Sequence, residues 1–256
     1  MILALDVGNT NIVLGCMEGD EILFECRFST DRNKTTAENA VLFKNVFDIY
    51  GIDLNKINGA IMSSVVPPID KILKEAIFVV TGYNPIEVNI KMNHGVKMST
   101  DNPEQLGNDI LVSLVAALDK YSVPSVIFDL GTATTLAVID RDRFFRGMAI
   151  LPGIKISQDT LTSKTSQLPA IAYEAPPNII GTNTVDAMKS GLIFGNASMM
   201  DGMIERIEDE LGEKVTVIAT GGLAECVASY CKHEIIHDDL IMLRGLKLLY
   251  DMNTEK

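Results

Sequence analysis

The same short pattern occurs twice in this chain, and it restricts the fold more than any other feature. Residues 3–14 read LALDVGNTNIVL and residues 126–140 read VIFDLGTATTLAVID. Each copy has an apolar run, an aspartate, an apolar residue, a glycine, small polar residues and a second apolar run. The aspartates, Asp6 and Asp129, are separated by close to half of the 256 residues. Self-similarity on this scale predicts a duplicated domain and not a solenoid of short repeats.

Strands alternate with helices along most of the chain. The apolar runs predict three strands at the start, over 2–5, 12–15 and 21–30. A helix should follow with Thr35 or Thr36 as its N-cap and Gly51 as its C-cap, and a buried strand should then end at Pro67. In the second half we expect helices over 154–165 and 183–210, a strand over 214–222 and a helix from Leu223. This order predicts two α/β domains with a boundary near 115–120, whose aspartate-bearing turns line a cleft between them.

Composition and charge exclude several classes of protein. With 47% hydrophobic residues the chain can bury a large core, and its net charge of −12 argues against a nucleic-acid partner. No apolar run reaches 18 residues, so no membrane span is expected. The start, MILALDVG, lacks a basic region and a cleavage site, so we interpret it as a strand and not a signal peptide. Four cysteines in a chain this long indicate a reducing, cytoplasmic setting.

The two polar turns have the chemistry of phosphate binding. Gly8 permits close approach of the main chain, and the Asn and Thr residues after it add hydrogen-bond donors. Asp6 would repel phosphate unless a cation such as Mg²⁺ lay between them. A later ATGG at 219–222 lies where a strand meets a helix. Ordinary turn chemistry explains one such hairpin; two matched copies favour a bound nucleoside triphosphate.

Further segments follow one another along the chain: MSSVVPP (62–68), DNPEQLGND (101–109), DLGTATT (129–135), LPGIKIS (151–157), LP (168–169), IGTNTVDAMKSGLIFG (180–195), VIATGGLA (217–224) and LRGLKLLY (243–250). The two turns resemble the phosphate loops of the acetate and sugar kinase/Hsp70/actin superfamily, and with these segments the chain as a whole resembles the bacterial type III pantothenate kinases. The resemblance implies duplicated actin-like (ribonuclease H-like) domains, 1–117 and 118–256, each with a central mixed sheet, and a nucleotide cleft between them. It also implies ATP-dependent phosphorylation of pantothenate, the first step toward coenzyme A.

The resemblance also implies an ATP site. The first phosphate loop would comprise Asp6, Val7, Gly8, Asn9, Thr10 and Asn11. Thr132 would belong to the second loop, and Gly221 and Gly222 would lie beside adenosine. Asp6 would hold Mg²⁺ through water, and Asp129 would bind a monovalent cation, K⁺ or NH₄⁺.

A substrate site is implied in the same way. Asp109 matches the catalytic base, which agrees with the need for a carboxylate to accept the proton of an alcohol during phosphoryl transfer. Thr184 matches a residue that reaches pantothenate from the neighbouring subunit, so a homodimer is expected. The implied substrate-binding residues are Thr100, Gly107, Asn108, Asp109, Ile110 and Thr184.

Two residues depart from the family pattern. Ile110 stands where arginine usually follows the aspartate, and Thr100 stands where tyrosine commonly precedes Asn-Pro. Losing an arginine contact to a carboxylate costs about 1.5–3 kcal/mol. Either other groups hold the acid of pantothenate, or the substrate is another small hydroxy acid, or the chain is a catalytically altered paralogue that binds nucleotide.

One motif points to different chemistry. HEIIH at 233–237 matches the H-E-x-x-H pattern of zinc proteases, in which both histidines lie on one helix face. Here Ile-Ile indicates a strand, which would place His233 and His237 about 13 Å apart. We therefore expect no zinc site, and we expect Cys226 and Cys231 to be core thiols.

Overall fold

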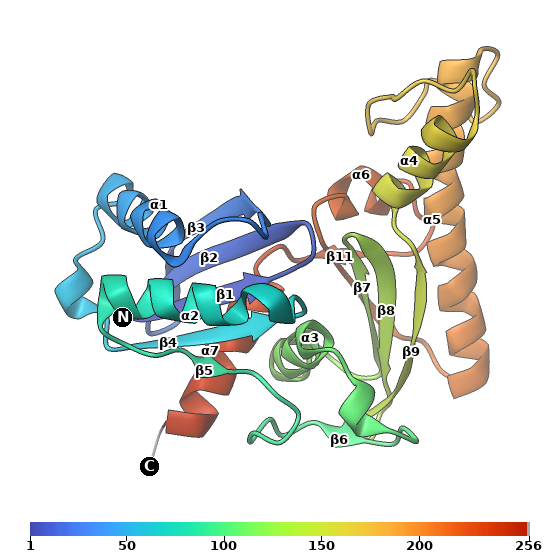
Figure 1. Cartoon of the computed structure of the whole chain (residues 1–256). Helices are drawn as coiled ribbons and strands as arrows, with labels where there is room; N and C mark the ends of the chain where they lie inside the picture. Colours follow the sequence, from blue (N-terminus) through green and yellow to red (C-terminus); the bar gives the residue numbers. More distant parts are fainter. Residues whose placement is uncertain (255–256) are drawn as a thin grey trace. The chain divides into compact units, whose positions relative to one another are not determined.

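A computed structural model describes residues 1–254 of the chain (Figure 1). The chain divides into two compact units. Unit 1 comprises Met1–Gly95, Asn102–Ala116 and Ile241–Lys256, and unit 2 comprises Val96–Asp101 and Ala117–Leu240. The expected boundary after residue 117 lies one residue from the point where the chain enters unit 2 for the second time. The sequence did not indicate that residues 96–101 group with unit 2 and the C-terminal helix with unit 1.

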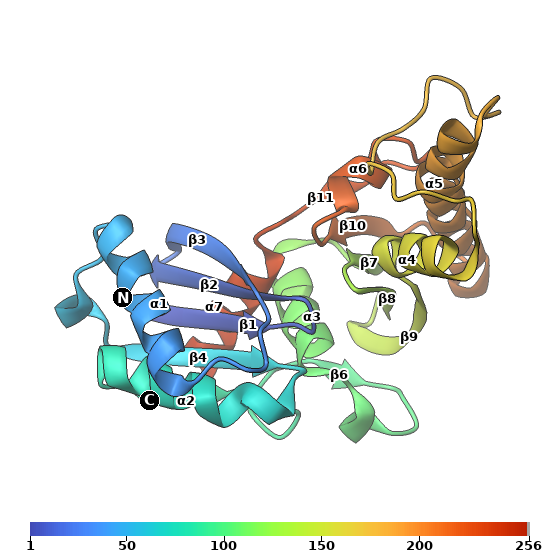
Figure 2. The same cartoon turned by 45° about the horizontal axis from the view of Figure 1, so that its top comes forward.

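Unit 1 is built on a five-stranded sheet with the order β3-β2-β1-β4-β5. The strands are β1 (Ile2–Val7), β2 (Asn11–Glu18), β3 (Glu21–Ser29), β4 (Gly59–Ser64) and β5 (Ile86–Glu87). The helices are α1 (Thr36–Ile49), α2 (Pro67–Thr81), the first part of α3 (Asn108–Lys120) and α7 (Ile241–Thr254), with short 3-10 turns at Leu54–Lys56 and Pro103–Gln105. In Figure 2, α1 and α2 lie on one side of this sheet and α7 on the other.

Unit 2 repeats this plan. Its sheet has the order β11-β10-β7-β8-β9-β6. The strands are β6 (Lys97–Met98), β7 (Ser125–Leu130), β8 (Ala133–Ile139), β9 (Phe144–Pro152), β10 (Thr216–Thr220) and β11 (Ile236–His237). The helices are α4 (Ile154–Lys164), the 28-residue α5 (Thr184–Leu211) and the short α6 (Ala224–Ala228).

The two sheets confirm the predicted duplication. In each one, the central strand pairs antiparallel with the strand that follows it and parallel with the strand after the first crossover: β1 with β2 and β4, β7 with β8 and β10. Asp6 and Asp129 occupy equivalent places, next to last in their central strands. In the parallel register Asp6 lies beside Ser63 and Asp129 beside Thr220.

The local signals in the sequence explain the ends of the unit 1 helices. Thr35 caps α1 in a capping box, since its hydroxyl accepts the Glu38 N–H (3.3 Å) and its own N–H donates to the Glu38 carboxylate (2.8 Å). The C-cap is Tyr50 and not Gly51 as predicted; the glycine follows the cap with φ of 67°. The preceding strand, β4, ends at Ser64 and not at Pro67 as predicted, and Pro67 is instead the first residue of α2.

Glycines let α7 approach the sheet of unit 1 closely. A Cβ on Gly59 would lie 1.8 Å from the Tyr250 hydroxyl, and one on Gly15 would lie 2.7 Å from the Leu243 side chain. The opposite face carries the core shared with α1 and α2, with Leu3, Leu5 and many other buried side chains. Within residues 1–254 no helix is long and apolar enough to cross a membrane.

Candidate active site

Residues 6–11, the expected first phosphate loop, form a tight hairpin turn between β1 and β2. The Gly8 N–H donates to the Asn11 carbonyl (2.9 Å), and a Cβ on Gly8 would lie 3.1 Å from that oxygen. Thr30, just after β3, holds the turn from one side: its hydroxyl donates to the Gly8 carbonyl (2.7 Å) and its N–H to the Thr10 carbonyl (2.9 Å). Because a trans peptide places its C=O and N–H on opposite sides, the Asn9 N–H is directed away from Thr30. The turn can therefore present a main-chain donor to an anion.

Two further features of this loop were not predicted. The Arg32 guanidinium donates to the Asn9 side-chain oxygen (3.2 Å), which places a positive charge at the tip of the turn. The Val7 side chain is fully buried in the core of unit 1, so only its main chain is available to a ligand. The sequence pattern did not link Arg32 to the turn, because the antiparallel pairing of β3 with β2 brings the two together.

Asp109 lies in the first turn of α3, where its Oδ1 accepts the N–H of Ile110 (2.8 Å). Burial raises the pKa of this carboxyl above its usual value, and hydrogen bonds from the N–H groups of Ile110 and of Asp109 itself oppose the rise. A Cβ on Gly107 would lie 2.5 Å from Oδ1. A side chain at position 107 would therefore meet the carboxylate of Asp109, and Gly107 stays a predicted substrate-binding residue.

The two residues on either side of Asp109 contact other parts of unit 1. The Asn108 side chain donates to the main-chain carbonyl of Ser64 at the end of β4 (3.2 Å). Ile110 is only 5% exposed and belongs to the core. Of these two expected substrate-binding residues, one is tethered to the sheet and the other offers no charge to a carboxylate. Thr100 belongs to unit 2, where it follows β6.

In unit 2 the second turn brings four expected ligand-binding residues together. Asp129 is next to last in β7, close to the turn of Gly131 and Thr132, and a Cβ on Gly221 would lie 2.6 Å from the Asp129 carboxylate. Gly221 has φ of 97°, which an L side chain rarely adopts, and Gly222 follows it. A Cβ on Gly153, the N-cap of α4, would lie 2.1 Å from the Thr132 carbonyl, so α4 begins directly against this turn.

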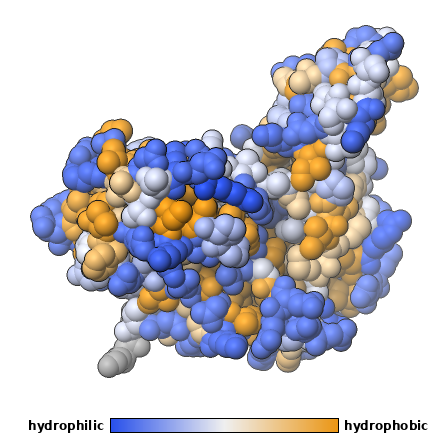
Figure 3. All heavy atoms as spheres, in the orientation of Figure 1, coloured by the Kyte–Doolittle hydropathy of each residue, from blue (hydrophilic) through white to orange (hydrophobic). Residues whose placement is uncertain are grey.

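Thr184 lies in a different part of unit 2. It is the first residue of α5, and it lines a cavity of about 570 Å³ between α4 and α5 together with Ser157, Leu168 and Asn196. None of the residues around Asp129 lines this cavity. Exposed apolar side chains lie along α4 and around the start of α5: Ile156, Leu161, Ile179, Ile180 and Val185. Figure 3 shows orange among blue in this part of unit 2.

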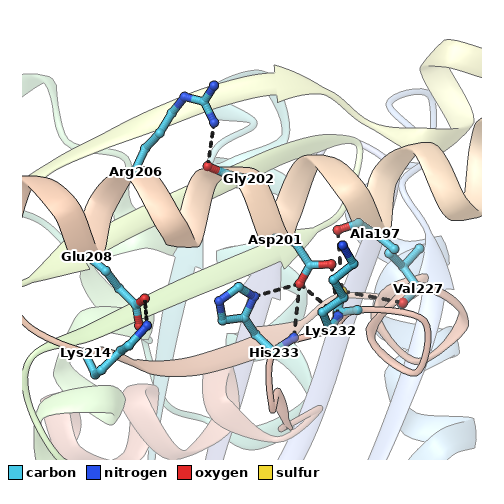
Figure 4. A network of polar contacts seen from close by, with 10 residues as sticks. Ala197, Asp201, Gly202, Arg206, Glu208, Lys214, Val227, Lys232 and His233 are labelled. Carbon is cyan, nitrogen blue, oxygen red and sulfur yellow. Dashed lines mark hydrogen bonds and ion pairs between the residues drawn. The ribbon is translucent and has the colours of Figure 1, made fainter.

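The two histidines of HEIIH bind different carboxylates (Figure 4 shows the first). His233 Nδ1 lies 2.8 Å from Asp201 on α5, which also accepts the N–H groups of Lys232 and His233 at 3.0 and 3.1 Å. Burial favours a higher pKa for Asp201, but the hydrogen bonds from His233 and Lys232 lower it below the usual value. His237 is in β11, not on a helix, and its Nε2 lies 2.9 Å from Asp239. This segment fastens the last loop of unit 2 to α5.

Two solved structures share this architecture. An activator of 2-hydroxyisocaproyl-CoA dehydratase from Clostridium difficile, solved with bound ADPNP, aligns over 98% of this chain and 94% of its own, with a TM-score of 0.54 and 12% identity. Component A of (R)-2-hydroxyglutaryl-CoA dehydratase from Acidaminococcus fermentans aligns over 97% and 96%, with a TM-score of 0.55 and 13% identity. The repeated sheet and these neighbours confirm the predicted actin-like fold.

Sequence comparison identifies the family. The model of the type III pantothenate kinase family matches residues 2–206. Type III pantothenate kinases from Exiguobacterium sp. and Geobacillus sp. are 42% and 40% identical to it, covering 100% of this chain and 100% and 99% of their own lengths. The chain therefore belongs to the type III pantothenate kinases, which phosphorylate pantothenate in coenzyme A biosynthesis.

Proposed function

We propose that Asp109 is the general base that accepts the proton of the terminal hydroxyl of pantothenate as the γ-phosphoryl group of ATP is transferred. The observation that supports this most is its environment: a partly buried carboxyl with a raised pKa, at the start of a helix, beside a glycine that has no side chain to displace it. A carboxylate whose proton affinity is raised toward neutral pH accepts a proton more readily than an exposed aspartate.

ATP is proposed to lie between two sets of main-chain donors. In unit 1 these belong to residues 6–11, where the Thr30 contacts turn the Asn9 N–H outward. In unit 2 they belong to the turn after Asp129, and Gly221 and Gly222 would lie beside the adenosine. Arg32 would supply an additional cation for the phosphates.

The residues present fit the expected cations. Asp6 supplies a partly buried carboxylate of the kind that holds Mg²⁺ through water, and Asp129 supplies oxygen ligands for K⁺ or NH₄⁺ beside Gly221. Bound Mg²⁺ would neutralise charge on the phosphates. The chain's own contribution is to orient the phosphates through its N–H groups and to remove the proton at Asp109.

We propose that Thr184 contacts pantothenate bound to the partner subunit in a homodimer. Its separation from the Asp129 turn within unit 2, and the exposed isoleucines and leucine at the ends of α4 and α5, support an arrangement in which a second copy covers this region. Thr100 and Ile110 remain proposed substrate neighbours. A cytoplasmic location fits the four free cysteines.

The test is a kinase assay with ATP, Mg²⁺, K⁺ and pantothenate, run on the wild type and on Asp109→Asn. We expect phosphopantothenate from the wild type and a loss of at least 100-fold in kcat for the variant, with ATP binding retained in calorimetry. A variant that keeps its rate would remove Asp109 from the mechanism.

Ile110 decides the second candidate, a kinase for another small hydroxy acid or an altered paralogue. Because residue 110 is a buried isoleucine, this chain has no cation at that position. Rates with pantothenate and with related hydroxy acids, repeated for Ile110→Arg, separate the alternatives. A strong gain on pantothenate alone would mean that the isoleucine is a handicap, whereas a better natural substrate would reveal a changed specificity.

A further inference from the structure

Hydrogen bonds from several elements of unit 1 converge on the last residue of β4, Ser64, and on Val65. The Ser64 hydroxyl donates to the Asp70 carboxylate in the first turn of α2 (2.5 Å) and accepts the Val66 N–H (3.0 Å). The Ser64 carbonyl accepts the Asn108 side chain (3.2 Å). Both sides of the hydroxyl are therefore engaged, which fixes its rotamer and the path of the main chain.

The adjacent residue is bonded to the phosphate loop. The Val65 N–H donates to the carbonyl of Val7 (3.0 Å), immediately before Gly8. Two consecutive residues thus hold the first phosphate loop on one side and, through Asn108, the residue next to Asp109 on the other. The distance between the loop and the start of α3 is set by one short piece of backbone.

We propose that Ser64 and Asn108 are positioning residues that hold the Asp109 carboxylate in register with the phosphate loop of residues 6–11; this rests on the proposed role of Asp109. Asn108 is the first residue of α3, yet its amide reaches to β4. Further along, α3 packs closely on α7, because a Cβ on Gly245 would lie 2.2 Å from the Val112 carbonyl. The start of the helix is therefore fixed by β4, and its following turn by α7.

This assignment differs from a direct role of Asn108 in binding substrate. Displacement of a catalytic group by about 1 Å can cost about 100-fold in rate. A positioning residue therefore lowers kcat and leaves the KM for both substrates nearly unchanged. A substrate ligand at position 108 would raise the KM for pantothenate instead, and Ser64 would have no share in the effect.

The experiment compares Asn108→Ala, Ser64→Ala and the double variant in steady-state assays with saturating ATP and varied pantothenate. We expect kcat to fall about 10- to 100-fold in each single variant, with KM within about threefold, and the double variant to be little worse than the poorer single one, because both act through the same link. Ser64→Thr, which keeps the hydroxyl, should restore most of the rate.

Two matched controls separate this role from general loss of structure. Asn39→Ala removes another buried asparagine whose amide donates to a main-chain carbonyl (3.0 Å), and Ser125→Ala removes a fully buried serine hydroxyl that has no hydrogen-bond partner. Both should keep the wild-type kcat. ATP affinity from calorimetry and thermal melting confirm that each variant is folded.

The outcomes are distinguishable. A raised KM for pantothenate with unchanged kcat in Asn108→Ala, multiplied rate losses in the double variant, or an equal rate loss in Asn39→Ala would each overturn the proposal. If Asp109→Asn retains full activity while the Asn108 variant does not, the base assignment fails and the link to β4 serves another group. Loss in Asp109→Asn together with non-additive losses at 64 and 108 supports both.

Discussion

Replacing Gly221 by alanine should destabilise unit 2 and weaken ATP binding together. The residue has φ of 97°, and its new Cβ would lie 2.6 Å from the Asp129 carboxylate and 2.7 and 2.8 Å from main-chain atoms of Leu130. The left-handed conformation costs an alanine about 1–2 kcal/mol. The contact with Leu130 adds about 1–3 kcal/mol, since backbone atoms cannot rotate away as a side chain can. The total is about 2–5 kcal/mol.

Gly212→Ala is the matched control. Gly212 also has a positive φ, 74°, but its Cβ would meet nothing within 4 Å. It should lose only the conformational part, about 1–2 kcal/mol. At about 2–4 °C per kcal/mol for a protein near this size, thermal melting resolves the two. Isothermal titration with ATP should show weaker binding for Gly221→Ala alone. Equal melting temperatures for the two variants would refute the close packing of Gly221 on Leu130.

Three other expectations follow from single contacts. Gly107→Ala would push the Asp109 carboxylate aside, since Oδ1 lies 2.5 Å from the new Cβ. In steady-state assays kcat should therefore fall at least tenfold. The melting temperature should change little, because a side chain and not the backbone must move. The raised pKa of Asp109 means that the folded state binds this proton more tightly than the unfolded chain, so the ionised carboxylate lowers stability above that pKa. In urea titrations Asp109→Asn should therefore be at least as stable as the wild type at pH 7, and the difference should close as pH falls below the usual aspartate pKa. The wild-type kcat should fall as pH drops through the raised pKa. Asp201→Ala should lose about 2–4 kcal/mol of folding free energy because it leaves the N–H groups of Lys232 and His233 without their acceptor. Since the pKa of Asp201 is lowered in the folded state, this stabilisation should fade on acidification. Asp209→Ala, at an exposed position of the same helix, should stay within about 0.5 kcal/mol of the wild type.

The duplication and the element types followed from local signals. Apolar runs broken by a polar turn are sufficient to predict β1 with β2 and β7 with β8, because the hairpin connection is short and the pairing local. Thr35 was predicted as an N-cap from chemistry that acts within three residues, whereas Pro67 was predicted only to end a strand and its place at the start of α2 comes from the structure. The strand order beyond each hairpin, with β4 beside β1, depends on a crossover through α1 and is confirmed only by the structure.

The contacts around the candidate site were beyond the reach of pattern reasoning. Thr30 and Arg32 hold the first loop because β3 returns beside it, and Ser64 meets Asn108 across 44 positions of sequence. Each of these side chains is an ordinary polar residue in its own neighbourhood. Only MSSVVPP, noted as a segment of the family resemblance, pointed to Ser64, and it gave no indication of what the serine contacts.

The glycines of the site also require a different interpretation from the one their sequence suggests. A glycine in a phosphate-binding turn is commonly explained by the approach of a ligand. Here the space beside Gly107 is filled by the carboxylate of Asp109, and the space beside Gly221 by that of Asp129. Each half of the chain therefore uses a missing Cβ to bury an acid against its own backbone. For Asp109 this burial raises the pKa, so Gly107 would affect the proposed base by changing how tightly the Asp109 carboxyl holds its proton. An alanine at either position should consequently disturb the carboxylate before any ligand is bound, which titration of Asp109 by NMR in the free Gly107→Ala protein would detect as a return toward the usual aspartate pKa.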